Sequence, residues 1–128
     1  MAETVDQAEV AIERPKQSLH SSSIVRAVLD YWNMDWRTIA GRKRLQSIST
    51  ARIMCGYLLR RRTHMSYCEI GTMMGRRDHS TVMYYVQKCG LDMIRNPAIR
   101  VTVEAIELSA EALERDRLDR QKSERSPV

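Results

Sequence analysis

The feature that most limits how this chain can fold is a pair of helix signals separated by a short glycine turn. The run Ser66–Glu69 fits a capping box, in which a serine at the N-cap and a glutamate three residues later bond the first N–H groups of a helix. Gly75 predicts the end of that helix. Asp78 is a suitable N-cap for a second helix, which we expect to run to about Cys89. Two short helices joined by such a turn form a helix-turn-helix unit.

The expected second helix has two unlike faces when its residues are placed at about 100° per residue. The side predicted to face the core carries Val82, Tyr85, Val86 and Cys89. The opposite side carries the hydrogen-bonding residues Ser80, Thr81, Tyr84, Gln87 and Lys88. Such a face can simply be solvated, but its place after a turn with Arg76 and Arg77 favours contact with DNA. A helix start beside two arginines and His79 also suits an anion.

The remaining apolar periodicity predicts an all-α bundle of five to six helices, because no segment shows the alternation of a strand. One helix begins at Ser21–Ser23, a minor turn includes Trp36 and Ile39, and a longer helix runs from about Ser49 to Arg62. In that longer helix Ile53, Met54, Tyr57 and Leu58 form the apolar face, with Arg52 and Arg60 off it.

The last helix should begin at Asn96-Pro97, an N-cap followed by a proline at the first helical position. Its apolar stripe consists of Ile99, Val103, Ile106, Ala110 and Leu113. This stripe can pack on the domain, or its distal part can form a seam with a partner or a second copy. We expect residues 1–22 to be a disordered tail, residues 23–110 to form the domain, and residues 111–128 to form a charged helical extension that frays.

Positive charge is concentrated in the middle of the chain. Residues 24–94 carry twelve bases against five acids, a net charge of +7, whereas the segments 1–23 and 95–128 carry −2 and zero. A basic folded region is the expected electrostatic footprint of a nucleic-acid-binding protein. Part of this charge is the loop run Arg42–Arg44, and part is Arg60–Arg62 at a helix end, where cations also complement the helix dipole.

Composition excludes several other classes of protein. No apolar run approaches 18 residues and the N-terminus lacks a signal peptide, so we expect neither a membrane span nor secretion. We therefore expect a cytoplasmic location. The three cysteines lie in apolar segments and are expected to be buried thiols. His64 and Cys68 could form half of a metal site, but no second pair accompanies them, and no cofactor is expected. The sequence shows no recognisable nucleophile–base arrangement, so we do not expect an enzyme.

The stretch from about Ile24 to Ala110 resembles the C-terminal DNA-binding domain, domain IV, of the bacterial replication initiator DnaA, which is helical with a Trp-repressor-like helix-turn-helix. The closest agreement is the segment Glu69-Ile70-Gly71 followed by Gly75-Arg76-Arg77-Asp78-His79-Ser80-Thr81-Val82. The resemblance implies that Arg44 enters a DNA minor groove, that Arg52 and Arg60 contact DNA and its phosphates, and that residues 78–81 contact bases and phosphates.

The chain departs from the family pattern at several positions. Thr50 stands where an arginine is frequent, Ile53 where a glutamine is common, Ser80 where a threonine is usual, and Tyr84-Tyr85 where His-Ala is usual. The preferred DNA sequence should therefore differ from the family's DnaA box. None of the five glycines belongs to a G-x-x-x-x-G-K-[ST] motif, so we expect a free-standing domain that binds no nucleotide and lacks the family's ATPase module.

We therefore predict a sequence-specific protein that binds double-stranded DNA in the bacterial nucleoid, at DnaA-box-like sites, in control of replication initiation or of transcription. The alternative is a protein-interaction adapter that has kept the helix-turn-helix scaffold. The predicted DNA-contacting residues are Lys43, Arg44, Arg52, Arg60, Arg77, Asp78, His79, Ser80, Thr81, Tyr84 and Lys88.

Overall fold

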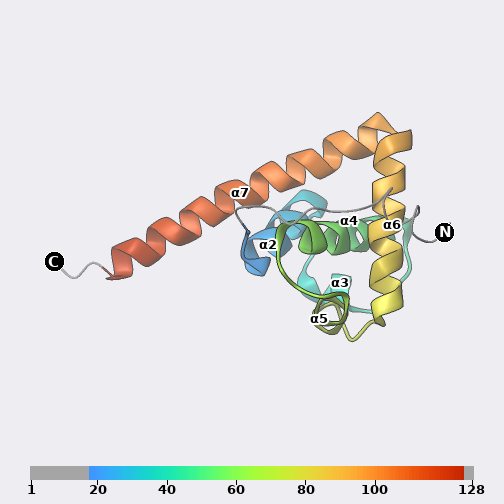
Figure 1. Cartoon of the computed structure of the whole chain (residues 1–128), viewed down its shortest axis with the longest axis horizontal. Coiled ribbons are helices and arrows are strands. Elements are labelled where there is room, and N and C mark those ends of the chain that lie inside the picture. Colours follow the sequence, from blue (N-terminus) through green and yellow to red (C-terminus); the bar gives the residue numbers. More distant parts are fainter. Residues whose placement is uncertain (1–17, 126–128) are drawn as a thin grey trace, which may run out of the picture.

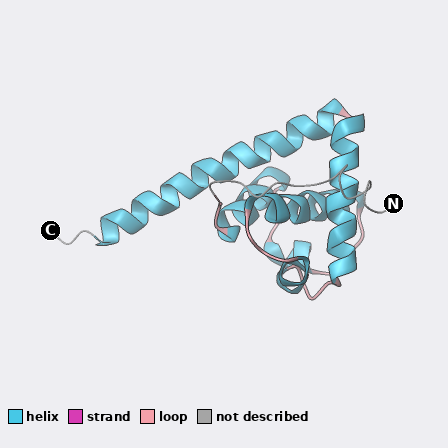
Figure 2. Ribbon diagram, viewed as in Figure 1, coloured by secondary structure: helices cyan, strands magenta, loops and turns pink. Residues whose placement is uncertain are grey.

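The computed structural model describes residues 18–125, and within them it contains six helices and no strand (Figures 1 and 2). The helices are α2 (Ser21–Trp32), α3 (Trp36–Ala40), α4 (Gln46–Arg62), α5 (Tyr67–Met73), α6 (His79–Arg95) and α7 (Pro97–Arg125). The all-α class and the predicted number of helices are therefore confirmed. The helix-turn-helix pair corresponds to α5 and α6, and the basic run Arg42–Arg44 lies between α3 and α4.

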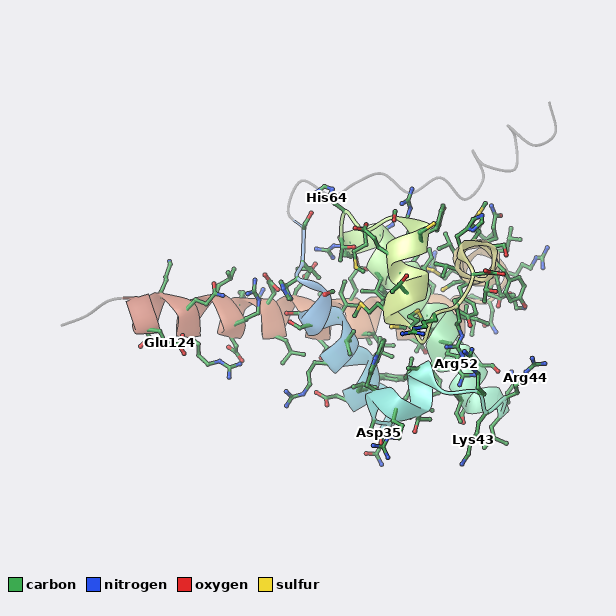
Figure 3. The ribbon with its side chains drawn as sticks, turned by 90° about the horizontal axis from the view of Figure 1, so that it is seen from below. Asp35, Lys43, Arg44, Arg52, His64 and Glu124 are labelled. Carbon is green, nitrogen blue, oxygen red and sulfur yellow. The ribbon has the colours of Figure 1, made fainter. Side chains whose placement is uncertain are left out.

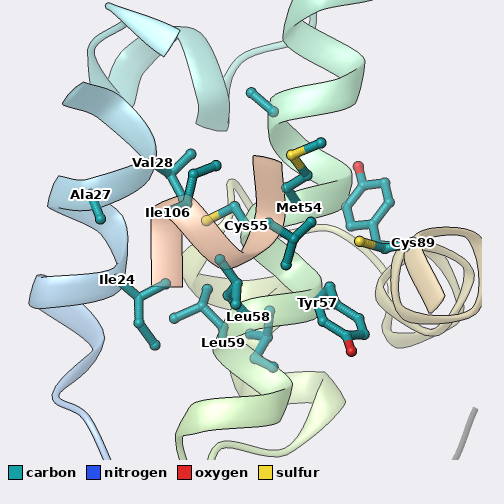
Figure 4. Packing of buried hydrophobic residues seen from close by; sticks show 14 of the residues in the cluster. Ile24, Ala27, Val28, Met54, Cys55, Tyr57, Leu58, Leu59, Cys89 and Ile106 are labelled. Atoms are coloured by element: carbon teal, nitrogen blue, oxygen red, sulfur yellow. The ribbon is translucent and has the colours of Figure 1, made fainter. Parts of the chain in front are cut away.

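The core forms around α4, which lies between α2 on one side and α6 on the other (Figures 1 and 4). Met54, Cys55, Leu58 and Leu59 of α4 are buried together with Ile106 of α7. Burial of a large aliphatic side chain contributes about 1.5–3 kcal/mol to folding. The apolar face of α4 therefore fixes where both of its ends lie, and these ends carry the two basic runs predicted from the sequence.

The predicted disordered tail is too long at its C-terminal end. Leu19 is buried, and its N–H donates to the carbonyl oxygen of Arg62 at 2.8 Å. His20 is the N-cap of α2, and its ring accepts a hydrogen bond from the N–H of Ser22 at 3.1 Å. Residues 18–22 thus belong to the fold, because a core contact and a helix cap hold them. Residues 1–17, the rest of that predicted tail, lie outside the described residues.

The stripe on α7 packs within the chain, against α2 and α6. Val103, Ile106 and Ala110 are buried, while Ile99 and Leu113 are partly buried against the same core. The first alternative is therefore the one observed. The second, a seam between the distal part of the stripe and a partner or a second copy, stays a prediction for the partly exposed Leu113, whereas the domain already covers Ala110.

The predicted domain boundary at Ala110 lies too early along α7, and the fraying predicted beyond it stays a prediction. Helix α7 continues to Arg125 and leaves the domain as a projecting rod (Figure 1). Glu114 is only 8 % exposed, and its carboxylate accepts hydrogen bonds from Ser23 Oγ at 2.8 Å and from the N–H of His20 at 3.1 Å. The domain thus extends at least to Glu114, since this carboxylate joins α7 to the start of α2.

The C-terminal end of α4 is joined to α7 by ion pairs. Arg62 Nη1 lies 2.6 Å from a carboxylate oxygen of Glu107 and 2.8 Å from one of Glu111, and Arg61 Nε lies 3.3 Å from Glu107. Burial of the Arg62 guanidinium opposes its charge, but the hydrogen bonds that it donates to Glu111 and Glu107 outweigh this effect and raise its pKa above the ordinary value. Arg61 and Arg62, two of the three arginines in this run, are therefore ion-paired within the fold.

The thiols differ from the sequence prediction at one position. Cys55 and Cys89 are buried, and burial raises the pKa of each thiol to about 12, but Cys68 is exposed on α5. The prediction fails there because α5 has only one buried face. Among residues 18–125 no group of three or more His, Cys, Asp or Glu side chains is placed to hold a metal ion. The helices in the same span include none with the length and hydropathy of a membrane span.

Candidate nucleic-acid interface

The helix-turn-helix begins with the predicted capping box. Ser66 Oγ accepts a hydrogen bond from the N–H of Glu69 at 3.1 Å, and the Glu69 carboxylate accepts one from the N–H of Ser66 at 2.7 Å. These bonds hold the pKa of the Glu69 carboxyl below its ordinary value. The first N–H groups of α5 are thereby satisfied, which fixes the direction in which the chain enters the unit.

Close packing of the turn between α5 and α6 requires a glycine in the turn, Gly75, and a second one within α5, Gly71. Gly75 has φ = 92°, and a Cβ atom there would overlap the carbonyl oxygen of Ala40. A Cβ atom on Gly71 would overlap the carbonyl oxygen of Arg77, whose N–H donates to Gly71 O at 2.8 Å. Arg76 also has a positive φ, 62°. The turn is therefore pressed closely against α5 and against the end of α3.

Helix α6 starts at the predicted place but without the predicted side-chain cap. Asp78 occupies the N-cap position with extended backbone, yet its carboxylate makes no capping hydrogen bond. Asp78, His79 and Ser80 are all exposed. The helix ends at Arg95, six residues beyond the predicted end at Cys89. Its first turn thus presents a free carboxylate, an imidazole and a hydroxyl to solvent, beside the positive end of the helix dipole.

The two faces of α6 are as predicted. Val82, Tyr85, Val86 and Cys89 are buried. On the other side Ser80, Tyr84 and Lys88 are exposed, with Tyr84 at 54 %, and Thr81 and Gln87 are half-buried. Lys88 Nζ lies 3.2 Å from a carboxylate oxygen of Asp92 one turn later. The outward face therefore carries groups that donate and accept hydrogen bonds along three successive turns.

The basic loop, which we define as residues 41–45, lies beside the helix-turn-helix turn. Lys43 and Arg44 are exposed and extend outward from the domain (Figure 3). Arg42 Nη2 donates to the carbonyl oxygen of Gly75 at 3.2 Å. The loop and the turn are therefore in direct contact, although more than thirty residues separate them in the sequence.

Arg52 is buried at only 4 % exposure, although helical periodicity placed it off the core face of α4. That expectation is wrong because the end of α3 and the basic loop cover this side of α4 and supply acceptors for a cation. Its guanidinium donates to four backbone carbonyl oxygens: Nε to Ile39 at 2.8 Å, Nη1 to Lys43 at 2.5 Å, and Nη2 to Thr38 at 3.1 Å and Gly41 at 2.9 Å. Burial, followed by repulsion from Arg77, lowers its pKa.

Arg77 is half-buried and approaches the basic loop from the other side. Its Nη2 donates to the carbonyl oxygen of Gly41 at 2.6 Å, and its Nη1 donates to Met74 O and, at 3.4 Å, to Ala40 O. The carbonyl of Gly41 thus accepts from both arginines. As with Arg52, most of the donors of Arg77 are directed at the backbone, away from solvent.

A groove of about 560 Å³ separates the basic loop from the start of α6, and we call it the arginine groove. Its lining residues are Arg42, Arg44, Ser49, Arg52, Ile53, Arg76, Arg77, Asp78, Thr81, Tyr84 and Tyr85. Five of these are arginines and one is an acid, so the groove is strongly positive. Like charges held together in this way destabilise the free protein, and an anion in the groove would offset that repulsion.

The structure brings together most of the predicted site and separates two members of it. Arg44, Arg52, Arg77, Asp78, Thr81 and Tyr84 line the arginine groove, with Lys43, His79 and Ser80 next to lining residues in the chain. Arg60 is at the far end of α4, with its guanidinium 4.2 Å from the centre of the Tyr67 ring and Nη1 donating to Met65 O at 3.2 Å. Lys88 is two turns further along α6.

Two groove arginines were not among the predicted DNA contacts. Arg42 belongs to the same basic run as Lys43 and Arg44, and Arg76 precedes Arg77 in the turn. The clustering of bases in both segments was the available signal. It could not show which side chains of each run share a groove, since that depends on the packing of the loop against the turn.

The model of the bacterial DnaA protein helix-turn-helix matches residues 21–89, more than half of the chain. The chain belongs to this DnaA helix-turn-helix family. The match covers α2 through the greater part of α6, and so includes the basic loop, the capping box and the arginine groove. Helix α7 lies beyond the matched residues.

Curated relatives carry the name chromosomal replication initiator protein DnaA. The protein from Roseiflexus castenholzii is 39 % identical over 84 residues, which are 66 % of this chain and 18 % of the relative. The protein from Treponema pallidum is 31 % identical over 93 residues, 73 % of this chain and 20 % of the relative. This chain therefore corresponds to about a fifth of the length of these DnaA relatives.

Proposed function

We propose that the chain binds double-stranded DNA through the arginine groove and the exposed face of α6. The observation that carries this proposal is the geometry of the groove, where five arginines and a single acid stand between an exposed basic loop and the start of an outward-facing helix. Phosphate is the anion that such a groove suits, because cations and a helix N-terminus both stabilise it.

In this proposal the first turns of α6 enter the major groove of DNA. The exposed carboxylate of Asp78 can accept a hydrogen bond from a cytosine amine, and the hydroxyls of Ser80 and Thr81 can bond base edges or phosphates. His79 and Tyr84 flank them on the same exposed surface. The phosphate chain beside that major groove would lie in the arginine groove, so that Lys43 and Arg44 reach the adjacent minor groove.

We assign Arg60 and Lys88 to phosphate contacts at the two edges of the interface. Arg60 is held by the Tyr67 ring and by a single hydrogen bond to a carbonyl, which leaves most of its donors available for a phosphate beside the capping box. Lys88 would break its exposed ion pair with Asp92 and contact a phosphate instead. Exposed pairs of this kind contribute roughly 0–1 kcal/mol, so the exchange has a small cost.

We further propose that the DNA sites resemble DnaA boxes and that binding serves control of replication initiation in the nucleoid. The names of the curated relatives support this use. Transcription control is the competing use, and mapping bound sites across the genome separates the two. Enrichment at the replication origin supports replication control, whereas enrichment confined to promoters would contradict it. Ile53 and Tyr84 line the groove, so the preferred sequence should differ from the family's box.

The test is selection of bound duplexes from a random pool, followed by binding measurements on the selected site and on random DNA. His79→Ala and Thr81→Ala should each lose about 1–3 kcal/mol on the selected site and little on random DNA, because they remove contacts to bases. Arg60→Ala should weaken binding to both duplexes equally, as expected for a phosphate contact. Recovery of no common motif, or equal losses on both DNAs for the first two variants, would reject sequence-specific binding.

A further inference from the structure

We propose that Arg52 and Arg77 act on DNA indirectly: they anchor the backbone of the basic loop to the helix-turn-helix turn and so hold Arg44 at a fixed distance from α6. This role rests on the proposed DNA-binding function of the groove. It replaces, for Arg52, the direct DNA contact that the sequence resemblance implied.

The donors of both arginines are directed at one stretch of backbone. Together they bond five of the six carbonyl oxygens from residue 38 to residue 43, namely those of Thr38, Ile39, Ala40, Gly41 and Lys43. The first three belong to the last turn of α3, where carbonyls lack the i+4 partner of a helix interior, although that of Thr38 also accepts from the N–H of Gly41 at 3.3 Å. The cations therefore cap the C-terminal end of α3, the end that its dipole makes negative.

Arg52 has few donors left with which to contact DNA. A guanidinium has five N–H donors, and Arg52 directs four hydrogen bonds to backbone oxygens while buried at 4 % exposure. None of the ion pairs among residues 18–124 includes Arg52 or Arg77. Their charges are compensated by carbonyl dipoles alone, so they still contribute positive potential to the wall of the arginine groove.

The anchored backbone ends directly before Arg44. The carbonyl of Lys43 is the last one bonded by Arg52, and Arg44 follows directly with an exposed side chain (Figure 3). On the other side, Arg77 ties Gly41 to the turn that leads into α6, and Arg42 donates to Gly75 in the same turn. The backbone of Arg44 and the start of α6 are therefore parts of one rigid unit before DNA arrives.

The proposal is tested first without DNA, by amide hydrogen exchange in the full chain. A lysine at position 52 keeps the charge but has one ammonium group, which cannot bond four carbonyls spread over six residues. Arg52→Lys should therefore raise the exchange rate of the loop amide that is hydrogen-bonded, that of Gly41, which donates to the carbonyl oxygen of Thr38 at 3.3 Å, by about tenfold or more, while amides of α4 and α6 stay protected. Arg26→Lys, at an exposed site on α2, is the matched control and should change nothing. Unchanged loop exchange in Arg52→Lys would overturn the proposal.

The second test is a double-mutant cycle on the selected DNA site. Arg44→Ala should weaken binding by about tenfold in the unmodified protein and by less than about twofold in Arg52→Lys, because a loosened loop no longer presents Arg44. Fully additive losses would mean that Arg52 contacts DNA by itself, and would overturn the proposal. If Arg52→Lys does not fold, Arg77→Lys loosens the same loop from the other side and enters the same two tests. Failure of the unmodified protein to bind DNA would count against the proposed function, and the exchange comparison would still decide the anchoring.

Discussion

Replacement of Gly75 by alanine should strongly destabilise the domain, because two independent costs arise at one position. The left-handed backbone at φ = 92° costs an L-residue about 1–2 kcal/mol. The added Cβ would also overlap the carbonyl oxygen of Ala40 and lie 3.0 Å from its carbon, so the turn and the end of α3 must separate. Together we expect a loss of about 2–4 kcal/mol in the free energy of unfolding.

Thermal unfolding followed by circular dichroism measures this loss. For a chain of this size a change of 1 kcal/mol shifts the midpoint by roughly 4 °C, so Gly75→Ala should melt about 8–16 °C below the unmodified protein. Arg76→Gly is the matched control, since it relieves a positive φ in the next residue and should leave the midpoint equal or slightly higher. A Gly75→Ala midpoint within about 2 °C of the unmodified protein would refute the close packing of the turn on α3.

Three further changes test other parts of the structure. A hydrogen bond from Arg117, with weaker help from α2 and against the effect of burial, lowers the pKa of Glu114 from 4.5 to about 2. This stabilisation is fully present above pH 4.5 and is lost as pH falls through 2. In denaturant titrations at pH 7, Glu114→Gln should therefore lower the free energy of unfolding by about 2–3 kcal/mol. The difference in free energy between the variant and the unmodified protein should shrink in acid. An equal cost for the exposed Glu104→Gln would contradict it. Arg62→Ala should lower the melting midpoint and speed amide exchange in α7 beyond the turns that carry Glu107 and Glu111. Unchanged amide exchange in α7 would count against a role of these ion pairs in holding the helix. Tyr84→Ala should alter the motif recovered from a random duplex pool; an identical motif would remove Tyr84 from sequence reading.

The local features of the helix-turn-helix were predictable because each depends on neighbours in the sequence. The capping box of Ser66 and Glu69, the turn at Gly75 and the two faces of α6 follow from hydrogen-bonding rules and helical periodicity. The basic loop followed from its run of charges, and family resemblance added the expectation that Arg44 in this loop contacts DNA. These features were sufficient to gather most of the predicted residues around one groove.

What the sequence could not show depends on contacts between distant segments. Periodicity placed Arg52 off the core of α4, because a helical wheel does not include the carbonyls of α3 that cover it. Leu19 and Glu114 were assigned to disordered or fraying segments, yet each is held by a partner at least forty residues away. Polarity at the chain ends did not predict the domain boundaries, since a single buried carboxylate or leucine is enough to extend a domain.

The most direct test of the central claim, that the arginine groove is where DNA lies, is the salt dependence of affinity for a short duplex. If about five phosphates are neutralised, the logarithm of the association constant should fall with the logarithm of salt concentration at a slope near −4.5. Removing the exposed charges of Arg44 and Arg76 together should reduce the slope to roughly −2.7, whereas removing Arg115 and Arg120 on distal α7 should leave it unchanged. A flat dependence, or a slope that responds to the α7 pair and not to the groove pair, would contradict the account.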